Sequence, residues 1–246
     1  MQNRQVIVTG AAGGMGCAVC ARLLSEGWSV IAIDSHAERL KSLEDELYKE
    51  APIGKLTTLE IDLTVPDLEE TVGGSIDPTT NFTGLVNLAG ISVGDTIGRL
   101  TDSDWNHSFE VNVSAAMRLS RLCAPLMARS GSGSIVNVSS PVAYIGARKP
   151  SYAASKAALI GLTMSLARNL GPDNIRVNIL LPGATTTNMT KDWTEEKISA
   201  VANSNFLQRM CSPTDVAGVI SFLLGDDSSY MTGAVVDLTA GGMVGH

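Results

Sequence analysis

Short runs of apolar residues alternate with longer amphipathic stretches along most of the chain. The apolar runs are rich in Val, Ile and Leu, which is typical of strands buried on both faces of a parallel sheet. The stretches between them have the periodicity of helices, and several end at a glycine. The predicted strands are residues 5–10, 29–34, 56–64, 84–90, 133–140, 175–183 and 234–242. The predicted helices are residues 15–27, 36–50, 102–130, 151–171 and 212–226.

This alternation predicts an α/β fold, a doubly wound parallel sheet of about seven strands with helices on both faces. Residues 65–81 give a weak helix at best, because Gly73 and Gly74 interrupt it. No linker, repeat or change of composition divides the chain, so we expect a single domain over residues 1–246. Within it, we expect the stretch 188–212 to form a lid over a substrate.

Composition and charge narrow the classes of partner. Hydrophobic residues make up 44% and charged residues 17% of the chain, as in an ordinary globular protein with a substantial core. The formal net charge of −7 disfavours nucleic acid and anionic membranes, because both repel an acidic surface. No apolar run is long enough to cross a bilayer, and the first residues lack the apolar segment of a signal peptide. We therefore expect a cytoplasmic protein.

Cys17 and Cys20 form a CxxC pair, which is the spacing of half a zinc site. A complete site needs a second pair of ligands, and Cys123, Cys211 and the three histidines show no such spacing. A redox pair is the alternative. Because the pair follows a glycine-rich turn, we interpret Cys20 as a small apolar residue that packs a helix onto the sheet, and we predict no metal.

A glycine-rich turn joins the first predicted strand to the first predicted helix. Its sequence, TGAAGGMG, places Gly10, Gly14 and Gly16 where a missing Cβ lets a phosphate group approach the backbone. The unpaired N–H groups at the start of the helix favour a pyrophosphate. Asp34 ends the second strand, eighteen residues after Gly16, and its carboxylate suits the ribose hydroxyls of an adenosine. The pattern predicts a dinucleotide-binding Rossmann fold.

Asp34 also bears on the choice of dinucleotide. A 2′-phosphate would meet a like charge there, and neither Gly13 nor Ser35 offers a basic side chain to offset it. His36 and Arg39 are the nearest basic candidates, and we do not expect either to point into the site. We therefore predict NAD as the cofactor, with NADP less favoured.

Tyr152 and Lys156 lie four residues apart in PSYAASKAAL, a stretch of small and apolar residues. On a helix this spacing puts the two side chains on one face. Free tyrosine, with a pKa of about 10, is a poor base at neutral pH. A neighbouring ammonium and a positive nicotinamide ring would lower that pKa by about 1–3 units and make Tyr152 an effective general acid and base. The alternative is a purely structural pair on a packed helix.

Taken in order, these motifs resemble the short-chain dehydrogenase/reductase family. Gly10-x-x-x-Gly14-x-Gly16 and Tyr152-x-x-x-Lys156 resemble its two signatures, and the likeness extends from end to end of the chain. The resemblance implies hydride transfer between a secondary alcohol and a ketone. The segments IDLT, NLAG, VNV, IVNVSS and PGATTT resemble further family segments. The cofactor-binding residues that the resemblance implies are Gly10, Gly14, Met15, Gly16, Asp34, Asp62, Leu63, Asn87, Ala89, Gly90, Tyr152, Lys156, Pro182, Gly183, Thr185 and Thr187.

The resemblance also implies a catalytic serine and a catalytic asparagine. Alignment through NVSS selects Ser140, twelve residues before Tyr152, whereas the family's common separation of thirteen would select Ser139. Neighbouring strand residues point to opposite faces, so only one serine can serve. We choose Ser140 and infer that the loop 141–151 is one residue shorter than usual. Asn112 is expected to hold a water that links the active-site lysine to solvent.

Two positions depart from the family pattern. Leu88 replaces the second Asn of NNAG, and Ala240 replaces the Asp of a C-terminal DGG. We expect these changes to affect local hydrogen bonds or subunit contacts, not the chemistry. The family resemblance further implies a homotetramer and a substrate pocket walled by residues 91–98, 141–149 and the lid.

The favoured function is an NAD-dependent dehydrogenase or ketoreductase acting on a small-molecule alcohol or ketone. The alternative is a 3-oxoacyl-[acyl-carrier-protein] reductase, which the overall pattern also resembles. That reaction usually uses NADPH, and an acidic carrier would prefer a basic rim. A third interpretation is a non-catalytic NAD-binding regulator, for which Tyr152, Lys156 or the serine should be missing. All are present, so an enzyme is favoured, while the substrate stays open.

Overall fold

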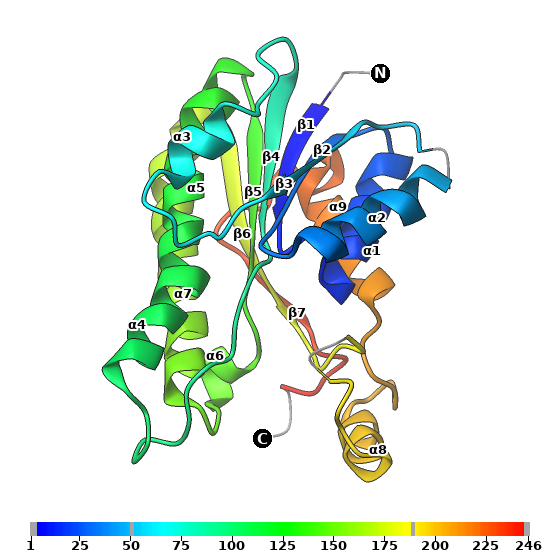
Figure 1. The fold of residues 1–246 in the computed structure, drawn as a ribbon, viewed down its shortest axis with the longest axis vertical. Coiled ribbons are helices and arrows are strands. Elements are labelled where there is room, and N and C mark those ends of the chain that lie inside the picture. Colours follow the sequence, from blue (N-terminus) through cyan, green and yellow to red (C-terminus); the bar gives the residue numbers. More distant parts are fainter. Residues whose placement is uncertain (1–3, 50–51, 188–189, 244–246) are drawn as a thin grey trace.

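The computed structural model describes residues 4–49, 52–187 and 190–243. Their strands form a seven-stranded sheet in the order β3-β2-β1-β4-β5-β6-β7, and all neighbouring strands are parallel. The strands are β1 Arg4–Thr9, β2 Ser29–Asp34, β3 Leu56–Glu60, β4 Asn81–Asn87, β5 Gly133–Val138, β6 Ile175–Pro182 and β7 Val235–Leu238. The predicted fold class is confirmed (Figure 1).

Helices cover both faces of this sheet (Figure 1). On one face lie α1, α2 and α9, and on the other lie α3, α5 and α7. The helices are α1 Gly14–Ser25, α2 Ala37–Lys49, α3 Leu68–Gly73, α4 Asp102–Phe109, α5 Ala115–Arg129, α6 Val142–Ile145, α7 Pro150–Leu170, α8 Glu195–Ser204 and α9 Pro213–Leu224. Short turns complete them: the π turn η1 Glu110–Ser114 and the 3₁₀ turns η2 Gly171–Asp173 and η3 Asp226–Ser228.

The alternation of strand side chains divides the core into two layers. Val6 and Val8 of β1 pack toward α1 and α9, whereas Ile7 between them packs toward α5. All three are fully buried, as the near-continuous apolar strands predict. Cys20 is also fully buried in the first layer, which confirms its interpretation as a packing residue.

The direction in which successive strands are added to the sheet reverses at its centre, between β1 and β4. β1, β2 and β3 extend to one side, and the chain then returns to pair β4 with the other side of β1. The carboxyl ends of β1 and β4 therefore diverge into loops that leave in opposite directions. In open α/β sheets, a crevice at this reversal is where ligands bind.

Local details differ from the sequence-based expectations. β3 ends at Glu60 instead of residue 64, and β4 begins at Asn81, three residues before the predicted strand. The weak helix expected in residues 65–81 is α3, and Gly74 caps its C-terminal end. The predicted loop 141–151 contains the single turn α6, and Pro150 begins α7 two residues before Tyr152.

The helix predicted over residues 102–130 is interrupted. α4 and α5 are joined by η1, whose wider turn contains Asn112. A π turn inserts one extra residue into a helix, often at a functional site. The hydrophobic period does not report such an insertion, so the sequence shows one continuous helix where the structure has two.

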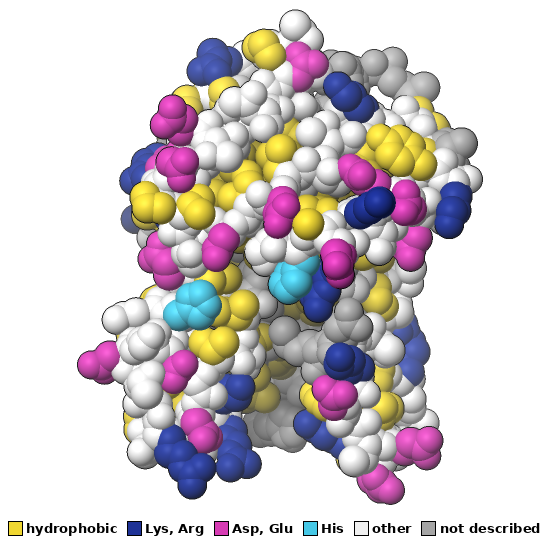
Figure 2. Space-filling view, viewed as in Figure 1, with side chains coloured by type: hydrophobic (Ala, Val, Ile, Leu, Met, Phe, Trp, Pro, Cys, Tyr) yellow, Lys and Arg dark blue, Asp and Glu magenta, His cyan; other side chains and the backbone are white. Residues whose placement is uncertain are grey.

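The surface agrees with an acidic chain. Figure 2 shows Asp and Glu side chains spread over both halves of the face that it presents. Among the described residues, no helix has the length and apolar character needed to cross a bilayer.

Candidate active site

The glycine-rich turn lies against the end of β4. Gly10 has a φ of +65°, and a Cβ added there would lie 2.9 Å from the Ala89 Cα. A Cβ added to Gly16 would lie 2.2 Å from the Gly10 carbonyl oxygen. Helix α1 can therefore begin close beneath the turn only because both positions lack a side chain. The free N–H groups of its first turn are directed to the edge of the sheet where β1 and β4 end.

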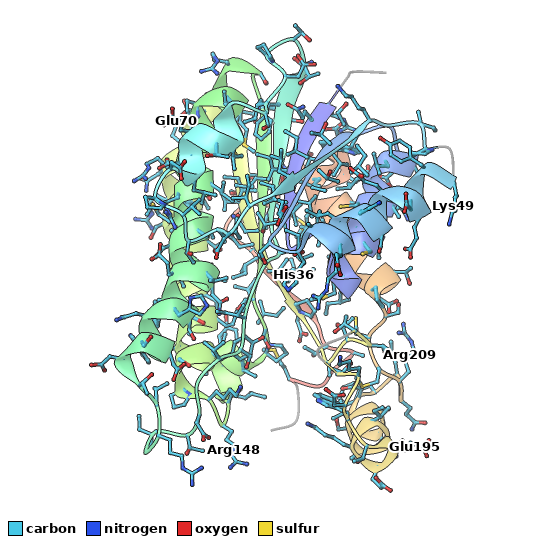
Figure 3. All side chains as sticks on the ribbon, viewed as in Figure 1. His36, Lys49, Glu70, Arg148, Glu195 and Arg209 are labelled. Carbon is cyan, nitrogen blue, oxygen red and sulfur yellow. The ribbon has the colours of Figure 1, made fainter. Side chains whose placement is uncertain are left out.

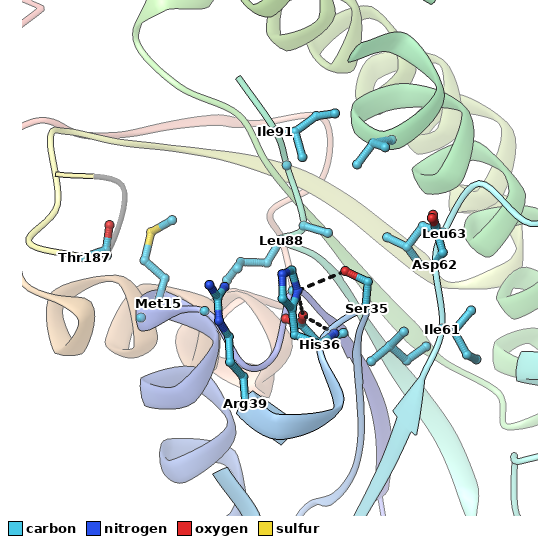
Figure 4. A pocket seen from close by; sticks show the side chains of 18 of the residues that line it. Met15, Ser35, His36, Arg39, Ile61, Asp62, Leu63, Leu88, Ile91 and Thr187 are labelled. Carbon is cyan, nitrogen blue, oxygen red and sulfur yellow. Dashed lines mark hydrogen bonds and ion pairs between the residues drawn. The ribbon is translucent and has the colours of Figure 1, made fainter. Parts of the chain in front are cut away.

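A cleft of ≈ 530 Å³ opens at this edge (Figure 4). Its volume is typical of pockets for small molecules, which span about 300–1,000 Å³. The glycine turn, the end of β2, the loop after β3, the end of β4 and η1 all contribute to its lining. The predicted cofactor residues that line it are Gly10, Gly14, Met15, Asp34, Asp62, Leu63, Ala89, Gly90 and Thr187.

The other predicted cofactor residues lie outside this lining. They are Gly16, Asn87, Tyr152, Lys156, Pro182, Gly183 and Thr185. Lys156 is nevertheless directly behind the cleft, because a Cβ added to the lining residue Gly90 would lie 2.9 Å from its Nζ. Asn87 is buried at the end of β4 and donates to the Asn137 Oδ1 at 2.8 Å.

The predicted nicotinamide loop follows β6. Pro182 ends this strand, and the Gly183 N–H donates to the Leu238 carbonyl of β7 at 2.9 Å. The buried Thr185 donates its hydroxyl to the Gly183 carbonyl at 2.9 Å. Of this loop, only Thr187 reaches the cleft lining. The predicted lid residue 189 lies outside the described residues.

Two basic residues that were not expected to point inward line the cleft. His36 and Arg39 lie three residues apart at the start of α2, so both side chains follow one face of its first turn. Because α2 begins directly after β2, that face borders the cleft (Figure 4). The expectation for both residues was therefore wrong. Sequence reasoning did not assign His107, Val111 or Lys191 to the cofactor site, although Val111 lies in the VNV segment and Lys191 in the predicted lid.

The Asp34 carboxylate is oriented by its neighbours. Its Oδ2 accepts a hydrogen bond from the Ala12 N–H at 3.1 Å, and its Oδ1 accepts one from the His36 N–H at 3.2 Å. The His36 Nδ1 also lies 3.2 Å from Oδ1 (Figure 4). The carboxylate thus presents a fixed negative charge at the end of β2, with an imidazole beside it.

Asp62 occupies the corresponding place after β3. Its Oδ1 accepts hydrogen bonds from the N–H and the hydroxyl of Thr64, both at 2.9 Å. These bonds hold the pKa of Asp62 below its ordinary value, and the nearby His107 adds a smaller effect in the same direction. Asp62 is therefore a fixed, ionised acceptor on the cleft wall.

Tyr152 and Ser140 approach each other beside the cleft. Tyr152 is in the first turn of α7, and its hydroxyl is hydrogen-bonded to the Ser140 side chain. Burial raises the pKa of Tyr152, and the bond to Ser140 opposes that rise. The neighbouring Ser139 is used differently, because its buried hydroxyl donates to the Lys156 carbonyl at 2.7 Å and fixes α7 to the end of β5.

Lys156 is buried on the same face of α7. Its side-chain Nζ donates to the Val138 carbonyl at 2.9 Å and lies 6.0 Å from the centroid of the Tyr152 ring. Burial lowers the pKa of Lys156 to about 8. Burial is the main cause of the raised pKa of Tyr152. The expected lowering of that pKa also requires the positive nicotinamide ring, so it stays a prediction.

Asn112 fixes the loop after β4 to the helices. Its Oδ1 accepts from the Ile91 N–H at 2.8 Å, and its Nδ2 donates to the Ile91 carbonyl at 3.0 Å and to the Ser155 hydroxyl at 2.9 Å. Ser155 in turn donates to the Tyr152 carbonyl at 2.9 Å. With these partners the Asn112 side chain orients the residues around it, and the water that it is expected to hold stays a prediction.

The cysteines and histidines form no recognisable metal site in the described parts of the chain, where no three His, Cys, Asp or Glu side chains gather. Cys17 is partly buried at the start of α1, and burial, with Glu46 and Asp34 nearby, raises the pKa of its thiol. A raised pKa makes a thiol less reactive, so the CxxC spacing carries no redox signature here.

Comparisons with known proteins agree with this geometry. Residues 4–198 match the family model for short chain dehydrogenases. The chain is 36% identical over 243 residues to a 3-oxoacyl-[acyl-carrier-protein] reductase of Thermotoga maritima, with 98% of each chain covered. It is 36% identical over 248 residues to a 3alpha-hydroxysteroid dehydrogenase of Mediterraneibacter gnavus, with 97% of this chain and 96% of that one covered.

A solved structure extends the likeness to three dimensions. L-sorbose reductase from Gluconobacter frateurii, complexed with NADPH and L-sorbose, matches with a TM-score of 0.90 at 27% identity. The match covers 100% of this chain and 98% of that one. The chain therefore belongs to the short-chain dehydrogenase family, and it is an oxidoreductase of the class that acts on CH–OH groups.

Proposed function

We propose that the chain is an NAD-dependent oxidoreductase that interconverts a secondary alcohol and a ketone, with Tyr152 as general acid and base. The observation that carries this proposal is the position of Lys156, which lies directly behind the wall of the cleft with its Nζ 6.0 Å from the centroid of the Tyr152 ring on the same helix. When bound, the nicotinamide supplies or accepts the hydride and, in its oxidised form, adds a positive charge.

The protein's own residues then handle the proton. Ser140 donates a hydrogen bond to the substrate oxygen and holds it near the Tyr152 hydroxyl. Because burial raises the pKa of Tyr152, the phenol is protonated at neutral pH and is poised to donate to a carbonyl oxygen. Lys156, with a pKa of about 8, can exchange a proton with water near neutral pH and binds the ribose of the nicotinamide half.

The remaining cofactor residues divide the dinucleotide among them. Gly10, Gly14, Met15 and Gly16 receive the pyrophosphate at the start of α1. Asp34, Asp62 and Leu63 hold the adenosine half, and Asn87, Ala89 and Gly90 line its path to the active site. The nicotinamide is bound by Pro182, Gly183, Thr185 and Thr187. The lid of this proposal is residues 188–212, which include α8.

NAD is proposed over NADP because Asp34 presents a fixed carboxylate where a 2′-phosphate would lie. His36, Arg39 and Lys191 line the same cleft and would partly offset that charge. The solved relative that contains NADPH makes NADP the competing cofactor. The ratio of kcat/KM for NADH to that for NADPH decides between them.

The test of the reaction class is turnover of NADH on a panel of ketones by the wild type and by Tyr152→Phe. We expect turnover by the wild type and loss of about three orders of magnitude in the variant, with NADH binding retained. Tyr48→Phe removes the hydroxyl of an exposed tyrosine at the end of α2, away from the cleft, and is the matched control. If NADH binds but neither the wild type nor Tyr152→Phe turns over any ketone of the panel, the regulator interpretation gains support; equal turnover by the two would contradict the role of Tyr152.

A 3-oxoacyl-[acyl-carrier-protein] reductase is the alternative, supported by the relative from Thermotoga maritima. An acetoacetyl thioester separates the two, because this alternative requires its reduction at a higher kcat/KM than that of steroid or sugar ketones. A homotetramer in the cytoplasm completes the proposal, and light scattering of the purified protein tests the assembly.

A further inference from the structure

Arg118 on α5 lies behind the wall of the cleft and joins two segments that line it. One guanidinium nitrogen donates to the Val65 carbonyl at 2.9 Å. The other donates to the Leu63 carbonyl at 2.8 Å and to the Glu110 carboxylate at 2.6 Å. The side chain is only 13% exposed, so these bonds are largely shielded from water.

The two segments have different places in the site. Leu63 follows Asp62 on the wall that receives the adenosine half, in the loop that leaves β3 toward α3 (Figure 1). Glu110 begins the π turn η1, whose next residue, Val111, also lines the cleft. Asn112 of the same turn holds both backbone groups of Ile91. A single side chain therefore connects the adenosine wall to the turn that positions the loop after β4.

We propose that Arg118 is a positioning residue that couples occupancy of the adenosine end of the cleft to the placement of Asn112 and Ile91. An adenosine packed against Leu63 limits the movement of the Leu63 and Val65 carbonyls. Because the guanidinium also binds Glu110, the movement of Glu110 is limited as well. Asn112 of the same turn then limits the movement of the Ile91 backbone. The proposal rests on the proposed function only in requiring that the cleft bind an adenine nucleotide.

Arg121, three residues further along α5, provides the matched comparison. It forms a two-pronged ion pair with Glu69 of α3 at 2.9 and 2.5 Å, so, like Arg118, it is an arginine of α5 that binds a carboxylate of another element. It is 60% exposed, and neither Arg121 nor Glu69 lines the cleft. Arg121→Met therefore removes an equivalent pair that has no connection to the site.

The experiment uses AMP, which carries the adenosine half alone. Calorimetry gives its dissociation constant for the wild type, Arg118→Met, Glu110→Gln and Arg121→Met. Amide hydrogen exchange of the peptide that contains Ile91 reports the coupling, because the Ile91 N–H donates to Asn112. Glu110→Gln removes the charge from the connection to η1 at a half-exposed position and leaves the two carbonyl contacts of Arg118 in place, so it keeps the test valid if Arg118→Met folds poorly.

We expect AMP to slow exchange at Ile91 in the wild type and in Arg121→Met. In Arg118→Met we expect AMP to bind about 10-fold more weakly and, when saturating, to leave exchange at Ile91 unchanged. Glu110→Gln should bind AMP almost normally and lose the effect on Ile91. Turnover with reduced nicotinamide mononucleotide, which lacks adenosine, should be stimulated by AMP in the wild type and not in Glu110→Gln.

The outcomes separate the two proposals. If the wild type does not bind AMP, the dinucleotide assignment fails and the coupling fails with it. If AMP binds the wild type but does not change hydrogen exchange at Ile91, the coupling alone is overturned. The same holds if AMP slows exchange at Ile91 in Arg118→Met and Glu110→Gln as much as in the wild type.

Discussion

Two regions of the molecule differ in what fixes their side chains. One is the cleft side, and the other is the lid side, which comprises the predicted pocket wall 141–149 and the predicted lid. Around the cleft, Asp34 and Asp62 are held by backbone N–H groups, and Lys156 is only 4% exposed. On the lid side, Phe206 is 71% exposed and Tyr144 is 56% exposed, so their rings have few fixed partners. Polar groups of the cleft are therefore fixed in position, whereas the lid side leaves apolar rings exposed.

Figure 3 shows the same contrast in the charged side chains. His36 lies at the carboxyl edge of the sheet, whereas Arg148, between α6 and α7, and Glu195, at the start of α8, lie near the lower end of the molecule in this view. Arg148 is exposed, which agrees with a solvated loop arginine. The carboxylates of the cleft thus have fixed hydrogen-bond partners, whereas Arg148 and Glu195 lie on exposed surface.

Among the substitutions that test this contrast, Gly16→Ala should have the largest effect, a loss of NADH affinity at the cleft. The added Cβ would lie 2.2 Å from a backbone oxygen, so the turn must move away from α1. We expect NADH to bind about 100-fold more weakly, which corresponds to ~3 kcal/mol of overpacking. Gly218→Ala in α9 meets nothing within 4 Å and should bind NADH normally. Fluorescence titration checks both, and normal binding by Gly16→Ala would contradict a rigid cleft.

The second-largest effect should be the contribution of Lys156 to the pH dependence of the free energy of unfolding. Burial lowers its pKa to about 8 from 10.5, so between these values the unfolded chain binds more protons than the folded one. Stability contributed at this site therefore rises with pH through that window. Relative to Lys156→Met, the wild type should gain about 2 kcal/mol in free energy of unfolding between pH 7 and pH 9.5.

Urea unfolding at the two pH values measures this gain. Lys41→Met removes an exposed lysine of α2 and should show no comparable change relative to the wild type. If Lys156→Met and Lys41→Met change the pH dependence of the free energy of unfolding equally, the burial of Lys156 has no more effect on its pKa than an exposed position has.

Sequence reasoning was most successful where backbone geometry demands a residue type. Gly10 and Gly16 are required by close approaches of under 3 Å, and the alternation of Val6, Ile7 and Val8 follows from a sheet covered on both faces. These constraints act between neighbours in the sequence or repeat with a fixed period. They were therefore visible before the fold was known.

What sequence reasoning did not reveal concerns balances between distant groups. The direction of the Tyr152 pKa depends on how deeply the fold buries the phenol, which the Tyr-x-x-x-Lys spacing does not contain. The π turn at Asn112 lies inside an unbroken helical pattern, and Arg118 reaches carbonyls more than 50 residues away. Arg39 lines the cleft because of where α2 begins after β2.

Asp34→Asn should have a smaller effect, a shift in the preference between NADH and NADPH. Removing the carboxylate leaves His36 and Arg39 at the cleft, so a 2′-phosphate no longer meets a like charge. We expect the ratio of kcat/KM for NADPH to that for NADH to rise about 10-fold. Asp45→Asn removes the same charge from an exposed position on α2 and should leave the ratio unchanged. An unchanged ratio in Asp34→Asn would remove the basis for preferring NAD.

The smallest effect should come from the lid side, where Phe206→Ala removes a largely exposed ring. Contact with roughly 30 Å² of that ring would stabilise a bound substrate by about 0.7 kcal/mol, or threefold in KM. NADH binding should not change, because Phe206 does not line the cleft. Tyr48→Ala removes another exposed aromatic ring, at the end of α2, and should change neither constant. If Phe206→Ala weakens NADH binding as much as substrate binding, the two sides are not independent and the contrast between them fails.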